Sequence, residues 1–294
     1  MCSAGARMVN IGRAAVIGYS TTVVAPEQIE RLVAREPTVI EICGLGQQHW
    51  RDVKRYVSNL PLKVGLHCPI PFDGWVSHFD ITGPDATRQE QAFDLVHRTL
   101  ESAAEVGAAY VNVHFPTVLD CNGESALRPE LGTSLAMRAA SRLSQLSERH
   151  GIQILLENVG PNPYFSISHD FVRVFEAFPN LKMCLDFGHA HVAPAGESIY
   201  CFAEIVAPYV ESMHVYNTTP QQYRVGFHAP PTPDQDERGG WMDLERLLGL
   251  VARNGRCAQL VFEYSAAHSE DEQAVRRSVE QISSTWRELC ATRG

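Results

Sequence analysis

Short apolar runs alternate with longer amphipathic segments along most of the chain. The short runs are rich in β-branched residues, which predicts strands, and the longer segments repeat apolar positions at helical spacing. The predicted strands are Ala14–Tyr19, Thr38–Cys43, Leu62–His67, Ala109–His114, Ile152–Glu157, Leu181–Asp186, Glu211–Val215 and Ala258–Tyr264. The predicted helices are Pro26–Arg35, Gln48–Ser58, Arg88–Val106, Pro129–His150, His169–Phe178, Ser198–Val206, Leu244–Asn254 and Glu270–Cys290. Each strand is therefore followed by a helix.

The strands are almost continuously apolar, which indicates a parallel sheet buried on both faces. Eight strand–helix units in 294 residues favour a single closed eight-stranded α/β barrel, with an open doubly wound sheet as the alternative. We expect one domain over residues 1–294, with residues 1–13 as a flexible leader. Two long connections, Cys68–Thr87 and Tyr216–Met242, follow strands, so both would lie on the face where such barrels place their active sites.

Composition narrows the range of partners. The chain is 45% hydrophobic and 20% charged, as in soluble globular proteins. A formal net charge of -9 argues against binding to nucleic acid or to an anionic membrane, although a small phosphorylated ligand remains compatible with it. No apolar run reaches the length of a membrane span. The eight cysteines are scattered, without a C-x-x-C pair or a secretory signal, which predicts reduced thiols and a cytoplasmic location.

Ionisable residues stand at the ends of seven of the eight predicted strands. In a barrel these ends converge on one rim, so residues far apart in sequence meet there. Clustered carboxylates would repel one another unless a cation lay between them, and carboxylate with imidazole is a ligand set for Mn²⁺, Mg²⁺, Co²⁺, Fe²⁺ and Zn²⁺. The pattern therefore predicts a divalent-metal site at the carboxyl ends of the strands. The seven residues are Glu41, His67, His114, Glu157, Asp186, His214 and Glu263.

Four of these residues carry the prediction. Glu157, Asp186, His214 and Glu263, which we call the quartet, come one each from four successive strands. A single histidine that ends a strand is as often a solvated group as a ligand, so the roles of the other two strand-end histidines stay open. Glu41 is expected to donate or accept hydrogen bonds beside the metal or to contact a substrate.

The segments ILLENVG, CLDFGHAH, SMHVYN and LVFEYS, in this order, resemble the xylose-isomerase-like TIM-barrel superfamily, which includes sugar and sugar-phosphate isomerases, epimerases and endonuclease IV. The resemblance to ketose epimerases implies one metal ion held by the quartet. It also implies that Glu157 and Glu263 exchange protons with the substrate from opposite sides, and that His189 contacts the sugar.

The resemblance to endonuclease IV implies further metal ligands. It gives His67 and His114 to a second ion, and His189 and His228 to a third. In that family the loop after the seventh strand carries a D-x-H motif, whereas this loop reads GFH, with Gly226 in place of the aspartate. The number of ions is therefore expected to lie between one and three.

We expect an isomerase or epimerase that acts on a sugar or sugar phosphate by proton transfer beside a metal-bound carbonyl or hydroxyl. The alternatives are a multinuclear metal phosphoesterase for a small phosphoester, a non-heme iron oxidative enzyme, and a barrel that only binds metal or sugar. The oligomeric state stays open and allows a homo-oligomer. The expected substrate contacts are Glu41, Trp75, Asn217, Arg224 and His228.

Overall fold

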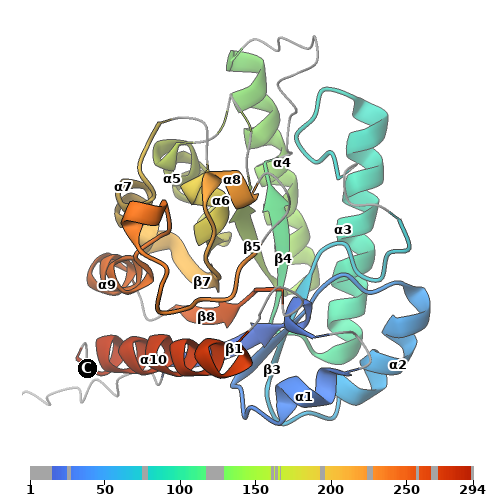
Figure 1. Cartoon of the computed structure of the whole chain (residues 1–294). Helices are drawn as coiled ribbons and strands as arrows, with labels where there is room; N and C mark the ends of the chain where they lie inside the picture. The colour runs from blue at the N-terminus through green and yellow to red at the C-terminus, as the bar shows by residue number, and fades with distance from the viewer. Residues whose placement is uncertain are drawn as a thin grey trace, which may run out of the picture.

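The chain folds as a closed barrel of eight parallel strands in chain order. The computed structural model describes residues 15–24, 28–74, 79–116, 129–159, 162, 165, 167–192, 196–223, 228–255, 258–265 and 271–292. The strands are β1 (Val16–Ser20), β2 (Val39–Ile42), β3 (Lys63–His67), β4 (Tyr110–Phe115), β5 (Gln153–Asn158), β6 (Lys182–Asp186), β7 (Val210–Val215) and β8 (Gln259–Phe262). Because β1 pairs with β8 the sheet has no open edge, and the blue first strand lies beside the red last strand in Figure 1. The prediction of a barrel rather than an open sheet is confirmed.

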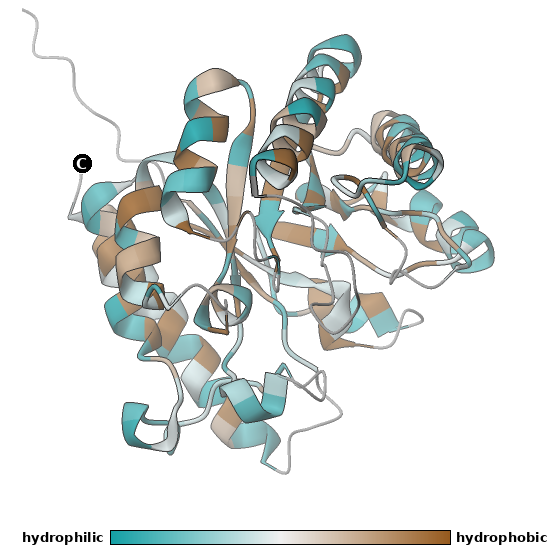
Figure 2. Ribbon diagram, turned by 90° about the horizontal axis from the view of Figure 1, so that it is seen from above, coloured by the Kyte–Doolittle hydropathy of each residue, from teal (hydrophilic) through white to brown (hydrophobic). Residues whose placement is uncertain are grey.

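Helices surround the strands and bury their apolar faces against them (Figure 1). The α-helices are α1 (Ile29–Val33), α2 (Gln47–Val57), α3 (Ala86–Val106), α4 (Pro129–His150), α5 (Ser168–Ala177), α6 (Phe187–His191), α7 (Ile199–Val206), α8 (Pro220–Tyr223), α9 (Leu244–Asn254) and α10 (Glu272–Ala291). Short 3-10 helices are Thr21–Val23, Ala207–Tyr209 and Glu237–Gly239. Figure 2 shows hydrophobic and hydrophilic positions mixed along the helices, as expected where one face packs on a sheet and the other meets water.

Local sequence explains where elements begin and end. The Asp85 side chain accepts hydrogen bonds from the N–H groups of Thr87 and Arg88, which caps α3. The same helix ends at Gly107, whose φ of 66° is left-handed and costs glycine little. Strand β2 reads VIEI and is buried at all four positions, so a carboxylate, Glu41, lies inside the barrel.

The structure corrects the predicted elements in three places. Helix α1 has five residues, about half of the predicted Pro26–Arg35. A short helix, α6, follows β6 directly, because the Asp186 side chain caps it by accepting from the His189 N–H at 2.7 Å. Strand β8 ends at Phe262, so Glu263 is the first residue after the strand rather than a member of it.

Three further expectations concern the N-terminal leader, membrane-spanning helices and the state of the cysteines. The predicted leader, residues 1–13, lies outside the described residues. Among the helices that the structure describes, none is both long enough and apolar enough to cross a membrane. Four described cysteines are free thiols, but Cys290 forms a disulfide bond, so the expectation that every thiol is reduced is wrong there.

Candidate metal centre

The strand register brings ionisable side chains to one end of the barrel. His114 on β4 lies beside Glu157 on β5, and Asp186 on β6 lies beside His214 on β7. Glu263 follows β8, the next strand in the barrel. Parallel strands that start at one end must finish at the other, so these residues share a rim although they span about half of the chain.

The quartet forms a compact, buried group. One ligand atom from each of Glu157, Asp186, His214 and Glu263 lies within 4.8 Å of the others. The His214 Nδ1 atom is central: it lies 2.7 Å from Glu263 Oε2, 3.4 Å from Glu157 Oε2 and 3.8 Å from Asp186 Oδ2. Every member is buried. The sequence prediction that these four residues meet is therefore matched by their positions.

Two atoms of the quartet fit a metal ion in particular. Among the residues that the structure describes, Asp186 Oδ2 and His214 Nδ1 are fully buried and make no hydrogen bond while the His214 ring is neutral with its proton on Nε2. Buried polar atoms without a partner are costly, and a cation between them would satisfy both. Three carboxylates and one imidazole also suit Mn²⁺, Mg²⁺, Co²⁺, Fe²⁺ or Zn²⁺.

The hydrogen bond at the second ring nitrogen of His214, Nε2, determines which nitrogen is available to an ion. Its Nε2 lies 2.9 Å from Glu41 Oε1, and the Tyr110 hydroxyl donates to Glu41 Oε2 at 2.8 Å. An ionised carboxylate can only accept, so Nε2 carries the proton that it donates to Glu41. The Nδ1 lone pair then faces the three carboxylates, in the arrangement that histidine ligands of metals commonly show.

Two further histidines approach Glu157 from β3 and β4. His67 Nε2 lies 3.0 Å from Glu157 Oε2, and His114 Nε2 lies 3.4 Å from Glu157 Oε1. The Asn112 side chain also donates a hydrogen bond to Glu157 Oε2. The atoms of His67, His114 and Glu157 form a second group compact enough to share an ion.

His189 and His228 lie next to the quartet without joining it. His189 Nδ1 is 2.9 Å from the Asn158 carbonyl oxygen, so Nδ1 carries a proton, and it lies 3.3 Å from Glu157 Oε1. The His228 ring stacks on Tyr216 with 4.0 Å between ring centroids, and Tyr216 donates to Asp186 Oδ1 at 3.0 Å. Within the described residues, the compact groups that can hold an ion include neither histidine.

Burial and mutual attraction shift the pKa values in this cluster. Burial disfavours the charged form of Glu157, but His214, His114 and His67 outweigh it and hold its pKa well below the usual range. Burial likewise opposes ionisation of Glu263, yet His214 brings the pKa of Glu263 to about 2. For Asp186, burial dominates and raises the pKa.

The pKa values of the histidines also shift in different directions. Burial lowers the pKa of His114. Burial also acts against charge on His67 and His189, but neighbouring carboxylates raise the pKa of each to about 9. Without an ion, the protons retained on His67 and His189 therefore offset part of the negative charge of the carboxylates.

The remaining predicted contacts lie elsewhere. Glu41 is fully buried, and its Oε1 atom lies 2.9 Å from His214 Nε2, so it has the hydrogen-bonding position that was one of its two expected roles. The Asn217 side chain accepts from the Met242 N–H at 3.1 Å and donates to the Met242 carbonyl oxygen at 3.3 Å, which ties the loop after β7 to the start of α9. Trp75 and Arg224 lie outside the described residues.

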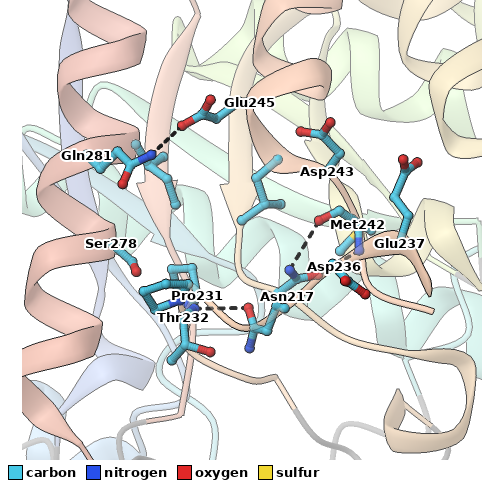
Figure 3. Close-up of a pocket in the computed structure, with 14 residues that line it drawn as sticks. Asn217, Pro231, Thr232, Asp236, Glu237, Met242, Asp243, Glu245, Ser278 and Gln281 are labelled. Carbon is cyan, nitrogen blue, oxygen red and sulfur yellow. Dashed lines mark hydrogen bonds between the residues drawn. The ribbon is translucent and has the colours of Figure 1, made fainter. Parts of the chain in front are cut away.

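A pocket of about 350 Å³ opens between that loop, the start of α9 and α10. Figure 3 shows Asn217 among its lining residues, together with acidic side chains such as Glu237 and Asp243. The described residues that line it include no member of the quartet. The pocket is therefore separate from the candidate metal centre.

Tyr110 and Asn112 donate hydrogen bonds to Glu41 and Glu157, respectively, and the pattern of strand ends does not identify either residue. A signal was available, because alternate residues of a strand point to the same face. Tyr110 and Asn112 precede His114 by four and two positions on β4, so all three share one face. A tyrosine and an asparagine in an otherwise apolar strand needed polar partners inside the barrel.

Comparison with known proteins gives a family and a fold. The sequence model of the family described as "xylose isomerase-like TIM barrel" matches residues 14–285. An uncharacterized protein of Methanocaldococcus jannaschii is 25% identical over 134 residues, which cover 45% of this chain. The match spans 49% of that relative, about half of its length.

Solved structures cover nearly the whole chain. A D-tagatose 3-epimerase-like protein has a TM-score of 0.72 and 13% identity, covering 95% of this chain and 100% of its own. An L-ribulose 3-epimerase also has a TM-score of 0.72, with 15% identity over 95% of this chain and 96% of its own. The IolI protein with a bound zinc atom has a TM-score of 0.63 and 15% identity, over 94% and 97%. At these identities the likeness concerns the fold.

Proposed function

Because the chain belongs to the family of xylose isomerase-like TIM barrels, we propose that it is a divalent-metal-dependent isomerase or epimerase of a small sugar or sugar phosphate. The observation that carries the proposal is the quartet, in which the buried Asp186 Oδ2 makes no hydrogen bond and His214 Nδ1 faces three carboxylates. An L-ribulose 3-epimerase, a D-tagatose 3-epimerase-like protein and a protein with a bound zinc atom, all solved structures of the same fold, support it.

Glu157 and Glu263 are our candidates for the acid–base pair. Their Oε2 atoms lie 3.4 Å and 2.7 Å from His214 Nδ1, on the side where an ion would be shared. Their Oε1 atoms face other partners: His114 and His189 for Glu157, and the Ser20 hydroxyl for Glu263 at 3.4 Å. Each glutamate thus has one oxygen for the ion and one that can take or return a proton.

The chemistry divides between the ion and the protein. When bound, the divalent ion would supply Lewis acidity that stabilises negative charge on a substrate oxygen as the neighbouring C–H proton leaves. One glutamate would accept that proton at its Oε1 atom, and the other would deliver a proton to the substrate. His189, fixed by the Asn158 carbonyl group, would orient a substrate hydroxyl.

Deuterium incorporation tests the proposal. We expect incubation with ketoses and ketose phosphates in deuterated water to place solvent deuterium on the carbon whose configuration changes. Glu157→Gln and Glu263→Gln should each remove this exchange, because an amide cannot accept the proton. Glu90→Gln, which changes an exposed ion pair with Arg142, is the matched control and should retain full activity. Full activity in both active-site variants would refute the acid–base assignment.

The group formed by His67, His114 and Glu157 favours a second candidate, a metal phosphoesterase for a small phosphoester. There, the quartet and this group, which have Glu157 in common, would hold the ions, and the bound ions would supply positive charge opposite the phosphoryl oxygens. Release of phosphate or a nucleotide from a generic ester, dependent on His114 and without deuterium exchange, would favour this candidate over the isomerase.

A further inference from the structure

The thiol of Cys43 lies at the same rim as the quartet, on the side of β2 and β3. Its ligand atom and those of His67 and Glu263 lie within 4.8 Å of one another. Cys43 is a free, half-buried cysteine, whereas His67 and Glu263 are buried. The three residues come from the ends of three strands, so the group does not depend on neighbours in sequence.

The backbone of Cys43 is held in place. Its N–H donates to the Thr21 hydroxyl oxygen at 2.9 Å, and that hydroxyl donates to the Cys43 carbonyl oxygen at 3.1 Å. Gly44 follows in the left-handed conformation, with φ of 67°, and turns the chain away from the strand. The thiol is therefore presented to the rim by a well-bonded segment.

His67 also presents a suitable nitrogen. Its Nδ1 lies 3.2 Å from the Cys68 carbonyl oxygen, which can only accept, so Nδ1 carries the proton. In the neutral ring, the form that binds a metal ion, the lone pair is then on Nε2, the atom that lies 3.0 Å from Glu157 Oε2. This nitrogen is the one that a metal ion at the rim would bind.

The negative charge at the rim exceeds what one divalent cation can offset. Four buried carboxylates, Glu41, Glu157, Asp186 and Glu263, lie around His214, and one divalent ion offsets only half of their charge. A second divalent ion would offset the remaining charge.

We propose that Cys43, His67 and Glu263 form a second, thiolate-containing metal site that shares Glu263 with the quartet and takes a thiophilic divalent cation such as Zn²⁺. On binding, the S–H bond of Cys43 breaks, its proton passes to solvent, and a sulfur–metal bond forms without any change of oxidation state. Thiolate and imidazole ligands select Zn²⁺, Co²⁺ or Fe²⁺ over Mg²⁺, which prefers oxygen. The inference rests on the metal centre proposed above but not on its reaction.

This site competes with the group of His67, His114 and Glu157, because both include His67. The two arrangements differ in their third ligand, a thiolate in one and an imidazole in the other. A cobalt titration distinguishes them, since only a thiolate gives a sulfur-to-cobalt charge-transfer band in the near ultraviolet.

The experiment adds Co²⁺ stepwise to ion-free full-length protein and records visible and near-ultraviolet absorbance. We expect visible d–d bands to develop with about the first equivalent and the charge-transfer band with about the second. Cys43→Ser should remove the charge-transfer band. Combining Cys43→Ser with His114→Ala, which takes a ligand from each of the two groups, should also reduce bound zinc, measured by elemental analysis, from about two ions per chain to about one. His114→Ala should retain the band.

Other thiols provide the controls. Cys201→Ser changes an exposed cysteine on α7 and should leave the spectrum unchanged. Cys184 also faces Glu157 and His214, so a band that survives in Cys43→Ser and disappears in Cys184→Ala would refute the assignment to Cys43. Visible bands without any charge-transfer band would overturn the second site and leave the first intact. No cobalt bands at all would overturn both the second site and the metal dependence of the proposed function.

Discussion

Replacing Glu41 by glutamine tests whether the residue beneath His214 tunes metal binding. Glu41 uses both carboxylate oxygens: Oε1 accepts from His214 Nε2 and Oε2 accepts from the Tyr110 hydroxyl. Glutamine has almost the same shape but only one acceptor oxygen and no charge. Glu41→Gln therefore weakens the contact that keeps the proton on Nε2 and the lone pair on Nδ1.

The expected loss follows from the hydrogen bonds that change. A hydrogen bond to a charged group contributes about 1.5–3 kcal/mol, and a neutral one about 0.5–1.5 kcal/mol. The difference, on the order of 1.4 kcal/mol, corresponds to about a tenfold loss of metal affinity. Glu41→Ala, which leaves His214 Nε2 without this partner, should approach the hundredfold loss known for such supporting residues. Tyr110→Phe keeps the Glu41 charge, so its loss should be smaller than that of Glu41→Gln.

Competition with a fluorescent chelator measures the dissociation constant of Co²⁺ or Mn²⁺ for each variant. Circular dichroism and thermal unfolding without metal show whether the barrel is intact. The order Tyr110→Phe, Glu41→Gln, Glu41→Ala, from weakest to strongest effect, supports the reasoning. Wild-type affinity in folded Glu41→Gln protein would refute it, because the geometry would then have no influence on the His214 ligand.

Two further predictions concern the pH dependence of metal affinity and the stability of two glycine variants. Burial acts to lower the pKa of His67 and His189, but neighbouring carboxylates raise both from 6.5 to about 9. The stability that these protons give the ion-free protein is complete below about pH 6.5 and is lost toward about pH 9. Metal affinity, measured in metal-buffered titrations, should therefore rise over the same pH range. A metal affinity independent of pH would contradict this reasoning. A Cβ atom at Gly18 would lie 2.0 Å from the Val39 carbonyl oxygen, so Gly18→Ala should cost about 1–3 kcal/mol of stability in denaturant unfolding. At Gly249 the nearest atom is a flexible arginine tip at 3.5 Å, so Gly249→Ala in α9 should gain up to about 1 kcal/mol, and equal effects of the two variants would contradict the packing argument.

The barrel and the quartet could be predicted because their signals repeat along the chain. Each strand is a buried apolar run, and the polar residue that interrupts its end is visible without knowledge of the fold. Parallel topology then places Asp186 and His214 at the same end of neighbouring strands. The same logic located Glu157 and Glu263.

Contacts that depend on depth within the barrel could not be predicted in this way. Glu41 pairs with His214 across 173 positions, and the strand-end pattern does not reveal whether a carboxylate lies at the open rim or beneath it. Asn217 looked like a substrate contact because it follows a strand, but its side chain holds the loop after β7. The approach of Cys43 to Glu263 also arises only when β8 closes onto β1.

A structure with bound metal tests the central claim most directly. Crystals grown with Mn²⁺ or Zn²⁺, and data collected at the absorption edge of the metal, locate each ion by its anomalous scattering. The account predicts a strong peak at about 2.0–2.3 Å from ligand atoms of Glu157, Asp186, His214 and Glu263. A saturated crystal in which these four side chains bind no ion, or point to separate places, would contradict it.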